Sequence, residues 1–321
     1  MVSRYLLFLL SILLLFVSEA PAYYPHDYVR IIKGEKNLNR ADLSSANLRG
    51  LKLYSLSCNQ SNLTGTDLSY TEMRDSQFNG ADFTGGKFVN NLFYKTRFQF
   101  ANFRLSTHYH SRWNTISAQN ATFFQSRINS IKIFESNFNH TSFHSAQIIG
   151  GKIQKSSFIK GIFINAGLNG IYFYQCKMNN ILWNFSRGIN NSFWLVDFSH
   201  SVFERIDFSS SRFVECNFNS CNFSQAKIKK SIMSASQMYG VKIIHAEFTG
   251  TNLSGSIFWK SHVENSDFSH CDLRGADFRH TIIKNVNFEN AQAEGTRFPK
   301  KYKELILKQN IRGKDKIIWE D

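Results

Sequence analysis

A strict five-residue period runs through most of this chain and constrains its fold more than any other feature. Steps of five from Leu38 to Phe298 visit 53 positions without one insertion or deletion. Large apolar residues occupy nearly all of them; the exceptions are Cys58, His108, Ala118, Gly188 and Ala293. Of the 31 Phe residues, 25 lie in this single frame, although chance would place only about one in five there.

A second frame lies two residues before the first and holds mostly small or aliphatic residues, such as Ala41, Ala46 and Ser61. Helices repeat their apolar stripe near 3.6 residues and strands alternate at 2, so neither element explains a period of five. Two inward positions per five residues require a short extended piece followed by a bend, repeated many times. Stacked coils of this kind bury a continuous apolar column.

The repeat units "ADLSSANLRGLKL" (41–53), "GADFTGGKF" (80–88) and "CDLRGADF" (271–278) resemble those of the pentapeptide-repeat family. The resemblance covers about residues 36–298. It implies an all-β solenoid, a right-handed quadrilateral β-helix with four pentapeptides per coil. The 53 positions then correspond to about 13 coils, and to a rod of roughly 60 Å at ~4.8 Å per coil.

The two ends of the chain differ from the repeat. Residues 1–22 read as a signal peptide, with Arg4, an apolar run over residues 5–17 and a small-residue cleavage site that ends at Ala22. We therefore expect an exported protein, periplasmic or extracellular after cleavage; the alternative is an uncleaved membrane anchor. Residues 23–35 are expected to cap the N-terminal end. Residues 299–321 are expected to form a C-terminal cap helix, over residues 300–310, and a tail after Gly313.

The five cysteines all point into the core in this register, Cys58 in the large-residue frame and the others in the small-residue frame. Buried cysteine often acts as a small hydrophobe, and we favour that role over a disulfide or a metal site. His108 points inward and His110 outward, so the two cannot share a metal. A core imidazole at position 108 needs a polar partner.

The sequence contains no nucleophile–base pair, phosphate-binding loop or nucleotide fingerprint, and a packed rod offers no pocket for a substrate. We expect neither an enzyme nor a cofactor, and no metal site.

Charge is distributed unevenly in a chain whose formal net charge is +14. Between Asp82 and Asp197 a single acid, Glu135, accompanies twelve Lys and Arg residues. With four pentapeptides in each coil, Arg112, Lys132 and Lys152 would be stacked in one outward column. The neighbouring face would carry Arg127 and Arg187. These five residues are the candidate binding residues.

The sequence thus predicts a non-catalytic exported scaffold that binds a protein or an anionic envelope component through its basic face. A structural spacer or secreted effector without a small ligand is the alternative. Some members of the resembled family mimic DNA with an acidic surface and bind gyrase. The basic charge of this chain argues against that partner.

Overall fold

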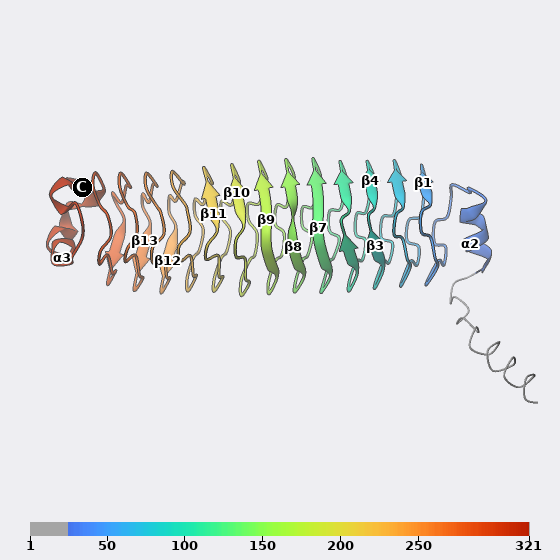
Figure 1. Ribbon diagram of the computed structural model, residues 1–321, viewed down its shortest axis with the longest axis horizontal. Coiled ribbons are helices and arrows are strands. Elements are labelled where there is room, and N and C mark those ends of the chain that lie inside the picture. Colours follow the sequence, from blue (N-terminus) through green and yellow to red (C-terminus); the bar gives the residue numbers. More distant parts are fainter. Residues whose placement is uncertain (1–24, 321) are drawn as a thin grey trace, which may run out of the picture.

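The computed structural model describes residues 25–320 and shows a straight rod of stacked coils (Figure 1). The rod runs from helix α2 (Pro25–Ile32) at one end to the short helix α3 (Lys303–Leu307) at the other. The expected signal peptide, residues 1–22, lies outside the described residues. No helix in the described part of the chain is long and apolar enough to cross a membrane.

The length of each coil follows from the backbone hydrogen bonds and strand pairs that join one coil to the next. Leu38 donates its backbone N–H to the carbonyl of Ser57 at 2.7 Å, and Asn62 donates to the carbonyl of Ala41 at 2.9 Å. The paired strands keep the same parallel offset, with Lys52 opposite Glu72. This offset equals four pentapeptides, so the predicted solenoid of about 13 coils is confirmed.

One parallel sheet contains eleven strands, and nine of them follow one another along one side of the rod. They are β1 (Lys52–Tyr54), β2 (Glu72–Arg74), β4 (Leu92–Tyr94), β6 (Arg112–Asn114), β7 (Arg127–Phe134), β8 (Gln147–Gln154), β9 (Gly167–Tyr174), β10 (Ser192–Trp194) and β11 (Arg212–Val214). We call their outward side chains the sheet face. These are the first and last residues of each three-residue strand and the equivalent pairs Lys132/Phe134, Lys152/Gln154 and Tyr172/Tyr174 of the longer strands.

The remaining strands lie on other sides of the coil. β3 (Lys87–Val89) and β5 (Thr107–Tyr109) join the sheet through the first half of β7. Near the C-terminal end a separate sheet contains β12 (Lys242–Ile244), β13 (His262–Glu264) and β14 (Ile282–Lys284). These three strands start two pentapeptides, or half a coil, away from the register of the sheet face, and therefore lie on the opposite side.

The large residues of the five-residue frame fill the core as stacked aromatic columns. Phe83, Phe103, Phe123, Phe143 and Phe163 follow one another, one per coil, with ring centroids 4.7–5.0 Å apart. Neighbouring columns meet edge to face, as Phe83 does with Phe88 at 5.5 Å. Stacked and edge-to-face contacts both suit the charge distribution of aromatic rings. Phe is therefore well suited to a core in which the same position recurs once per coil.

Polar residues in the small-residue frame bond to the backbone of the preceding coil. The Ser61 hydroxyl donates to the carbonyl of Leu38 at 2.7 Å, and the Thr141 hydroxyl donates to the carbonyl of Ala118 at 2.8 Å. Both residues are buried. The bonds explain why a dry core tolerates so many Ser and Thr residues, since a buried hydroxyl without a partner would be costly.

The bend in each repeat falls on the second residue after the large side chain. Its φ angle is positive, for example 58° at Ser45 and 59° at Asn120, and Gly is frequent there. Glycine has no Cβ and asparagine tolerates the left-handed region, so the composition of this position follows from the backbone.

The N-terminal end of the core is covered by α2. Ile31 is buried against the first coil. The Asp27 carboxylate accepts a hydrogen bond from the backbone N–H of Asp42 at 2.9 Å, and Arg30 donates to the carbonyl of Asn37 at 2.8 Å. These contacts satisfy backbone groups that an open edge would expose.

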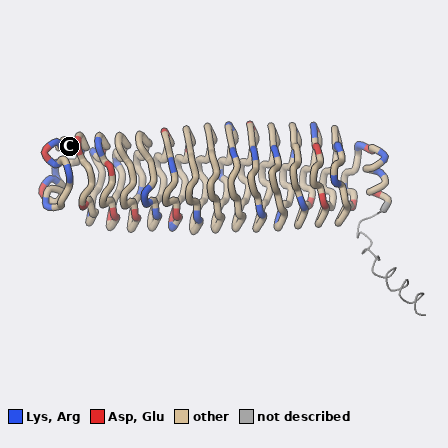
Figure 2. Tube along the Cα trace, in the orientation of Figure 1, with Lys and Arg blue, Asp and Glu red and all other residues tan. Residues whose placement is uncertain are grey.

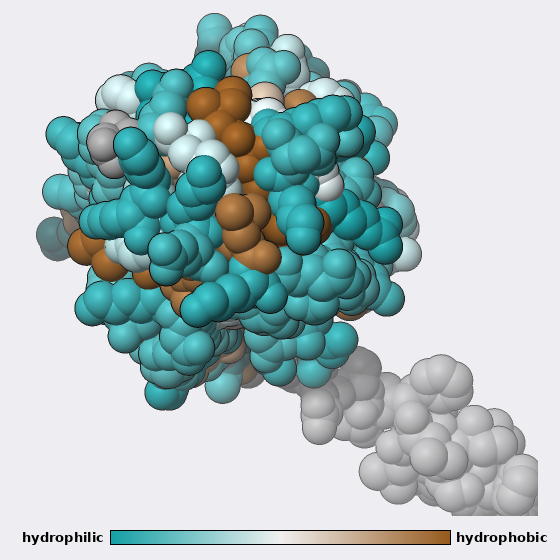
Figure 3. All heavy atoms as spheres, turned by 90° about the vertical axis from the view of Figure 1, so that its left-hand side faces the viewer, coloured by the Kyte–Doolittle hydropathy of each residue, from teal (hydrophilic) through white to brown (hydrophobic). Residues whose placement is uncertain are grey.

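The C-terminal end has a smaller helix than expected and no free tail in the described residues. Turn η1 (Lys300–Tyr302) leads into α3, where Ile306 is buried but Leu305 is 47% exposed. After Gly313, turn η2 (Lys314–Lys316) and strand β16 (Ile318–Glu320) follow, and β16 pairs with β15 (Arg297–Pro299). The expected tail therefore forms part of a further coil. Figure 3 shows that this end of the rod is mostly hydrophilic, with a small hydrophobic patch.

Candidate functional site

The structure brings three of the five predicted binding residues together on the sheet face. Arg112 on β6 lies opposite Lys132 on β7, which in turn lies opposite Lys152 on β8. All three side chains are exposed. Because neighbouring strands are about 4.8 Å apart, three positive charges follow one another at nearly equal steps along the rod.

Arg127 and Arg187 belong to the neighbouring side of the coil, as expected, but they do not form a cluster. Gln147 and Gly167 lie between them in the same column, so the two arginines are three coils apart. Arg187 lies 4.0 Å from Asp207, whereas Arg127 has no carboxylate within that distance among the described residues. Of the five predicted binding residues, only Arg112, Lys132 and Lys152 lie on adjacent strands.

Most cations in the basic middle segment have no acidic partner. Of the twelve Lys and Arg residues between Asp82 and Asp197, only Lys87, Lys155 and Arg187 have a carboxylate of the described chain within 4.0 Å. Near the C-terminal end, tight pairs such as Arg274–Asp272, at 2.7 Å, are frequent. Figure 2 shows the same contrast, with Asp and Glu found mainly toward the two ends.

Aromatic side chains accompany the cations on the sheet face. The outward positions of this face carry Tyr54, Tyr94, Phe134, Tyr172, Tyr174 and Trp194. Several cations pack against these rings. Lys152 Nζ lies 5.4 Å from the centroid of the Tyr172 ring, and Lys155 Nζ lies 5.5 Å from that of Phe134. The rings lie within the range of attraction to a cation, so they help to hold the lysine side chains in place.

Sequence reasoning found the cations of this face but missed its aromatic residues. The signal was available, because steps of one coil from Tyr54 reach Tyr94, Phe134, Tyr174 and Trp194, with Arg74, Asn114 and Gln154 between them. This signal lies in the outward positions, whereas the five-residue frame describes only the inward ones. Once the coil length is known, each outward column can be read separately.

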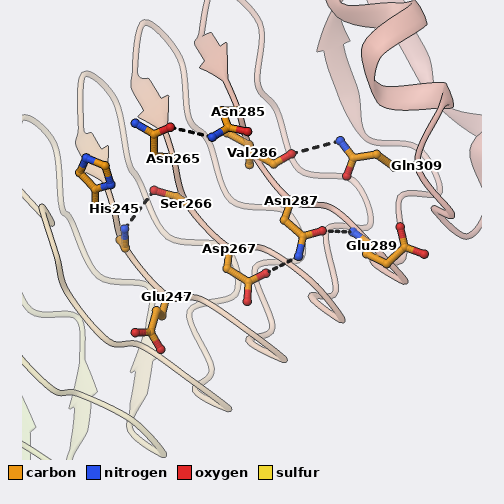
Figure 4. A pocket seen from close by; sticks show the side chains of 11 residues that line it. His245, Glu247, Asn265, Ser266, Asp267, Asn285, Val286, Asn287, Glu289 and Gln309 are labelled. Atoms are coloured by element: carbon orange, nitrogen blue, oxygen red, sulfur yellow. Dashed lines mark hydrogen bonds between the residues drawn. The ribbon is translucent and has the colours of Figure 1, made fainter.

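A groove of about 610 Å³ near the C-terminal end has the opposite charge (Figure 4). Glu247, Asp267 and Glu289 line it along successive coils. Its polar groups bond to one another: Asn287 Nδ2 donates to Asp267 Oδ1 at 3.0 Å, and the Glu289 backbone N–H donates to Asn287 Oδ1 at 3.0 Å. These hydrogen bonds join the polar groups of the groove to one another, so their arrangement is explained by the packing of successive coils. Among residues 25–320, no group of three His, Cys, Asp or Glu residues could hold a metal ion.

Four of the five cysteines, all but Cys58, replace serine in the small-residue frame, as their predicted inward register requires. Cys221 Sγ donates to the carbonyl of Phe198 at 3.0 Å, and Cys271 Sγ donates to that of Phe248 at 3.0 Å, the same bond that the serines make. All five thiols are free and buried. Burial raises the pKa of both Cys221 and Cys271 to about 12, so their thiols are poor nucleophiles.

His108 is buried in the core, as its frame predicts, and His110 is exposed. The His108 ring stacks on Phe88 with centroids 4.5 Å apart, and its Nε2 lies 2.9 Å from the Ser106 hydroxyl. Burial lowers the pKa of His108 to about 3, so the ring is neutral at physiological pH. A neutral, stacked imidazole takes the place of a phenyl ring in its column.

Comparison with known proteins supports the repeat assignment. The profile described as pentapeptide repeats matches eight copies, within residues 46–85, 192–234, 221–259 and 264–298. No curated protein sequence matches the chain.

Two solved structures illustrate the similarity. A trypsin-treated variant of QnrB1, a plasmid-mediated fluoroquinolone resistance protein, is 19% identical over 56% of this chain and 92% of its own, with a TM-score of 0.44. HetL, a pentapeptide repeat protein involved in heterocyst differentiation regulation from the cyanobacterium Nostoc sp. strain PCC 7120, is 14% identical over 82% of this chain and 94% of its own, with a TM-score of 0.32. The eight matched copies and the unbroken five-residue frame together show that this chain is built from pentapeptide repeats.

Proposed function

We propose that the protein is a non-catalytic, exported scaffold that binds an anionic partner along its sheet face. One observation carries the proposal: Arg112, Lys132 and Lys152 are stacked on adjacent strands, and none has a carboxylate of the described chain within 4.0 Å. Export rests on the signal-like sequence of residues 1–22.

The solenoid does not need this column of cations. Like charges on neighbouring strands repel one another, and the same column carries Leu92 before Arg112 and Tyr172 after Lys152, so neutral residues fit equally well. A negatively charged partner would relieve the repulsion. It would also release the counterions that the column attracts, which makes binding sensitive to salt.

The shape of the surface suggests how such a partner would lie. The sheet face is part of a straight, rigid rod, and its cations follow the rod axis rather than surrounding a pocket. An extended chain with regularly spaced negative charges can meet several cations at once. A compact anion can meet only one or two.

The test compares binding of the purified protein to heparin at low and moderate salt with binding by the triple variant Arg112→Glu/Lys132→Glu/Lys152→Glu. The matched control is Lys230→Glu/Lys242→Glu/Lys260→Glu, which makes the same charge change at exposed positions near the C-terminal end. We expect the first triple variant to lose at least about tenfold in affinity and the control to lose clearly less.

Both triple variants leave every core position unchanged, so their melting temperatures should stay close to that of the wild type. Equal losses in the two variants would mean that heparin responds only to net charge. Absence of heparin binding by the wild type would contradict the proposal and favour the structural spacer.

A further inference from the structure

The aromatic residues of the sheet face narrow the class of partner, and this inference rests on the function proposed above. Besides holding lysine side chains, outward Tyr, Phe and Trp residues offer apolar faces that a purely electrostatic contact would leave unused. From β4 to β10 the sheet face carries Tyr94, Phe134, Tyr172, Tyr174 and Trp194 beside its column of cations. Its occupant should therefore have both negative charges and faces that can pack against aromatic rings.

The rings are fixed in place by their neighbours. Tyr172 and Tyr174 lie nearly parallel, 10° apart, with centroids separated by 6.3 Å. Lys95 Nζ lies 5.3 Å from the Tyr94 ring centroid. Tyr94, Phe134 and Tyr172 therefore combine an apolar surface with a nearby cation, and the tyrosines add hydroxyl groups that can bond to hydroxyl-bearing ligands.

The spacing of the cations favours one kind of polymer. Arg112, Lys132 and Lys152 repeat once per coil, at about 4.8 Å. A pyranose residue linked through opposite ring positions extends a sugar chain by nearly the same step, so a chain with one carboxylate per sugar could match one charge to each coil. A strand of duplex DNA advances about 3.4 Å along its axis per phosphate and winds around that axis, so its phosphates do not follow a straight column of cations with one charge per coil.

An anionic membrane fits this surface less well. Stable adsorption to a lipid surface requires apolar side chains that protrude into the headgroup layer. On the sheet face Tyr94 is only 37% exposed, whereas the most exposed aromatic and aliphatic side chains, Phe100 at 66% and Leu105 at 55%, lie on other sides of the coil. A sheet face of half-buried rings suits a ligand that lies flat on it.

We propose that the sheet face binds a linear acidic polysaccharide, a polyuronate, which lies along the rod with about one sugar per coil. Its carboxylates meet Arg112, Lys132 and Lys152. Its sugar rings pack against the aromatic side chains of the neighbouring outward column, Tyr94, Phe134, Tyr174 and Trp194, and against Tyr172, which continues the column of cations.

The test measures affinity of the full-length protein for three polymers: polygalacturonate, its methyl ester, and polyphosphate. The methyl ester keeps the sugars and removes the charge, whereas polyphosphate keeps the charge and has no sugars. The aromatic triple variant is Tyr94→Ala/Tyr174→Ala/Trp194→Ala. Its control, Tyr70→Ala/Tyr109→Ala/Tyr239→Ala, removes exposed tyrosines from other sides of the rod.

We expect polygalacturonate to bind more tightly than either other polymer. The aromatic triple variant should lose about tenfold or more in affinity for polygalacturonate, and it should bind polyphosphate as the wild type does. The control should bind both polymers normally. If the alanine variant folds poorly, Tyr94→Leu/Tyr174→Leu/Trp194→Leu keeps side-chain bulk and should show the same selective loss.

Two outcomes would overturn the inference and leave the proposed function standing. One is tighter binding to polyphosphate, single-stranded DNA or vesicles of anionic lipid than to polygalacturonate. The other is an unchanged affinity for polygalacturonate in a folded aromatic variant. Absence of binding to every anionic polymer would remove the proposed function as well.

Discussion

The middle and the C-terminal end of the rod share one core and differ in their surfaces. In the middle, between β4 and β9, the sheet face carries stacked cations and aromatic rings. In the last coils the same outward positions hold Asn252, Asp272 and Arg274, and regular strands form on the opposite side instead. The contrast shows that the repeat determines which residue types face the core of each coil, whereas the residues that face outward can vary.

The charges differ in the same way. Arg274 Nη2 lies 2.7 Å from Asp272 Oδ2, and Arg279 Nη2 lies 2.7 Å from Asp277 Oδ2, so the last coils neutralise their cations within the molecule. Most cations of the middle coils have no such partner among the described residues. These unpaired cations are available to a partner. In the binding experiments the middle coils therefore serve as the site, and the C-terminal coils serve as the control.

The largest expected effect comes from breaking the frame where the two regions meet. Insertion of one residue after Phe213 on β11 should prevent folding of the coils that follow, because every later side chain moves to the wrong side of the coil. Expression and circular dichroism melting measure the loss. Duplication of residues 196–215, which adds one whole coil, is the matched control and should leave a folded rod. A one-residue insertion that melts like the wild type would contradict the frame.

A smaller but still large effect tests whether the two regions share one core. Phe143 lies between Phe123 and Phe163, at 5.0 and 4.9 Å, and Phe278 lies between Phe258 and Phe298, at 4.4 and 5.0 Å. Removal of either ring leaves a cavity in a stacked column. Phe143→Ala and Phe278→Ala should each lower the free energy of unfolding by about 3–5 kcal/mol.

Chemical denaturation of the two variants measures these losses. Phe→Leu at the same positions, which keeps most of the volume, should cost less in both regions. A loss at one site that is several times the loss at the other would show that the core is not uniform along the rod.

The smallest expected effect concerns the ion pairs at the C-terminal end. The hydrogen bond from Arg274 lowers the pKa of Asp272 below its ordinary value. An acid with a lowered pKa in the folded state stabilises the protein above its unfolded pKa of about 4, and this contribution disappears as the pH falls through the folded value. Asp272→Asn should therefore destabilise the protein slightly at pH 7, by no more than about 1 kcal/mol.

At a pH below the folded pKa, the Asp272→Asn variant should melt like the wild type. The control is Glu135→Gln in the middle, where the carboxylate is half-exposed and 3.9 Å from Lys155; it should match the wild type at both pH values. A loss for Asp272→Asn that persists in acid would contradict the charge-based explanation, because an amide oxygen can still accept the backbone N–H of Arg274, as Asn252 Oδ1 does from Ser254.

Much of the candidate site followed from the sequence once the coil length was known. The alignment of Arg112, Lys132 and Lys152 needs only a count in whole coils, and the structure shows all three on adjacent strands. The aromatic columns could have been found by the same count. That these cations have no acidic partner could not be predicted from the sequence, because ion pairs depend on which rotamers long side chains adopt across neighbouring coils.

The ends of the rod were harder to predict than its middle. The five-residue pattern stops at Phe298, and without it nothing in the sequence showed that residues 318–320 return to pair with β15. Trp319 completes the core there by stacking on Phe298, with centroids 6.0 Å apart. Contacts of this kind depend on where the last coil leaves an open edge, which only the folded chain defines.

The amino-acid sequence was sufficient to establish the coil length, the inward frames and the stacking of side chains that are one coil apart, because a strict period leaves a single register that buries every large residue. It did not show on which side of each coil a regular sheet forms, which cations remain unpaired, or how the ends close. Those features arise from contacts between side chains of different coils, and such contacts exist only after the chain has folded.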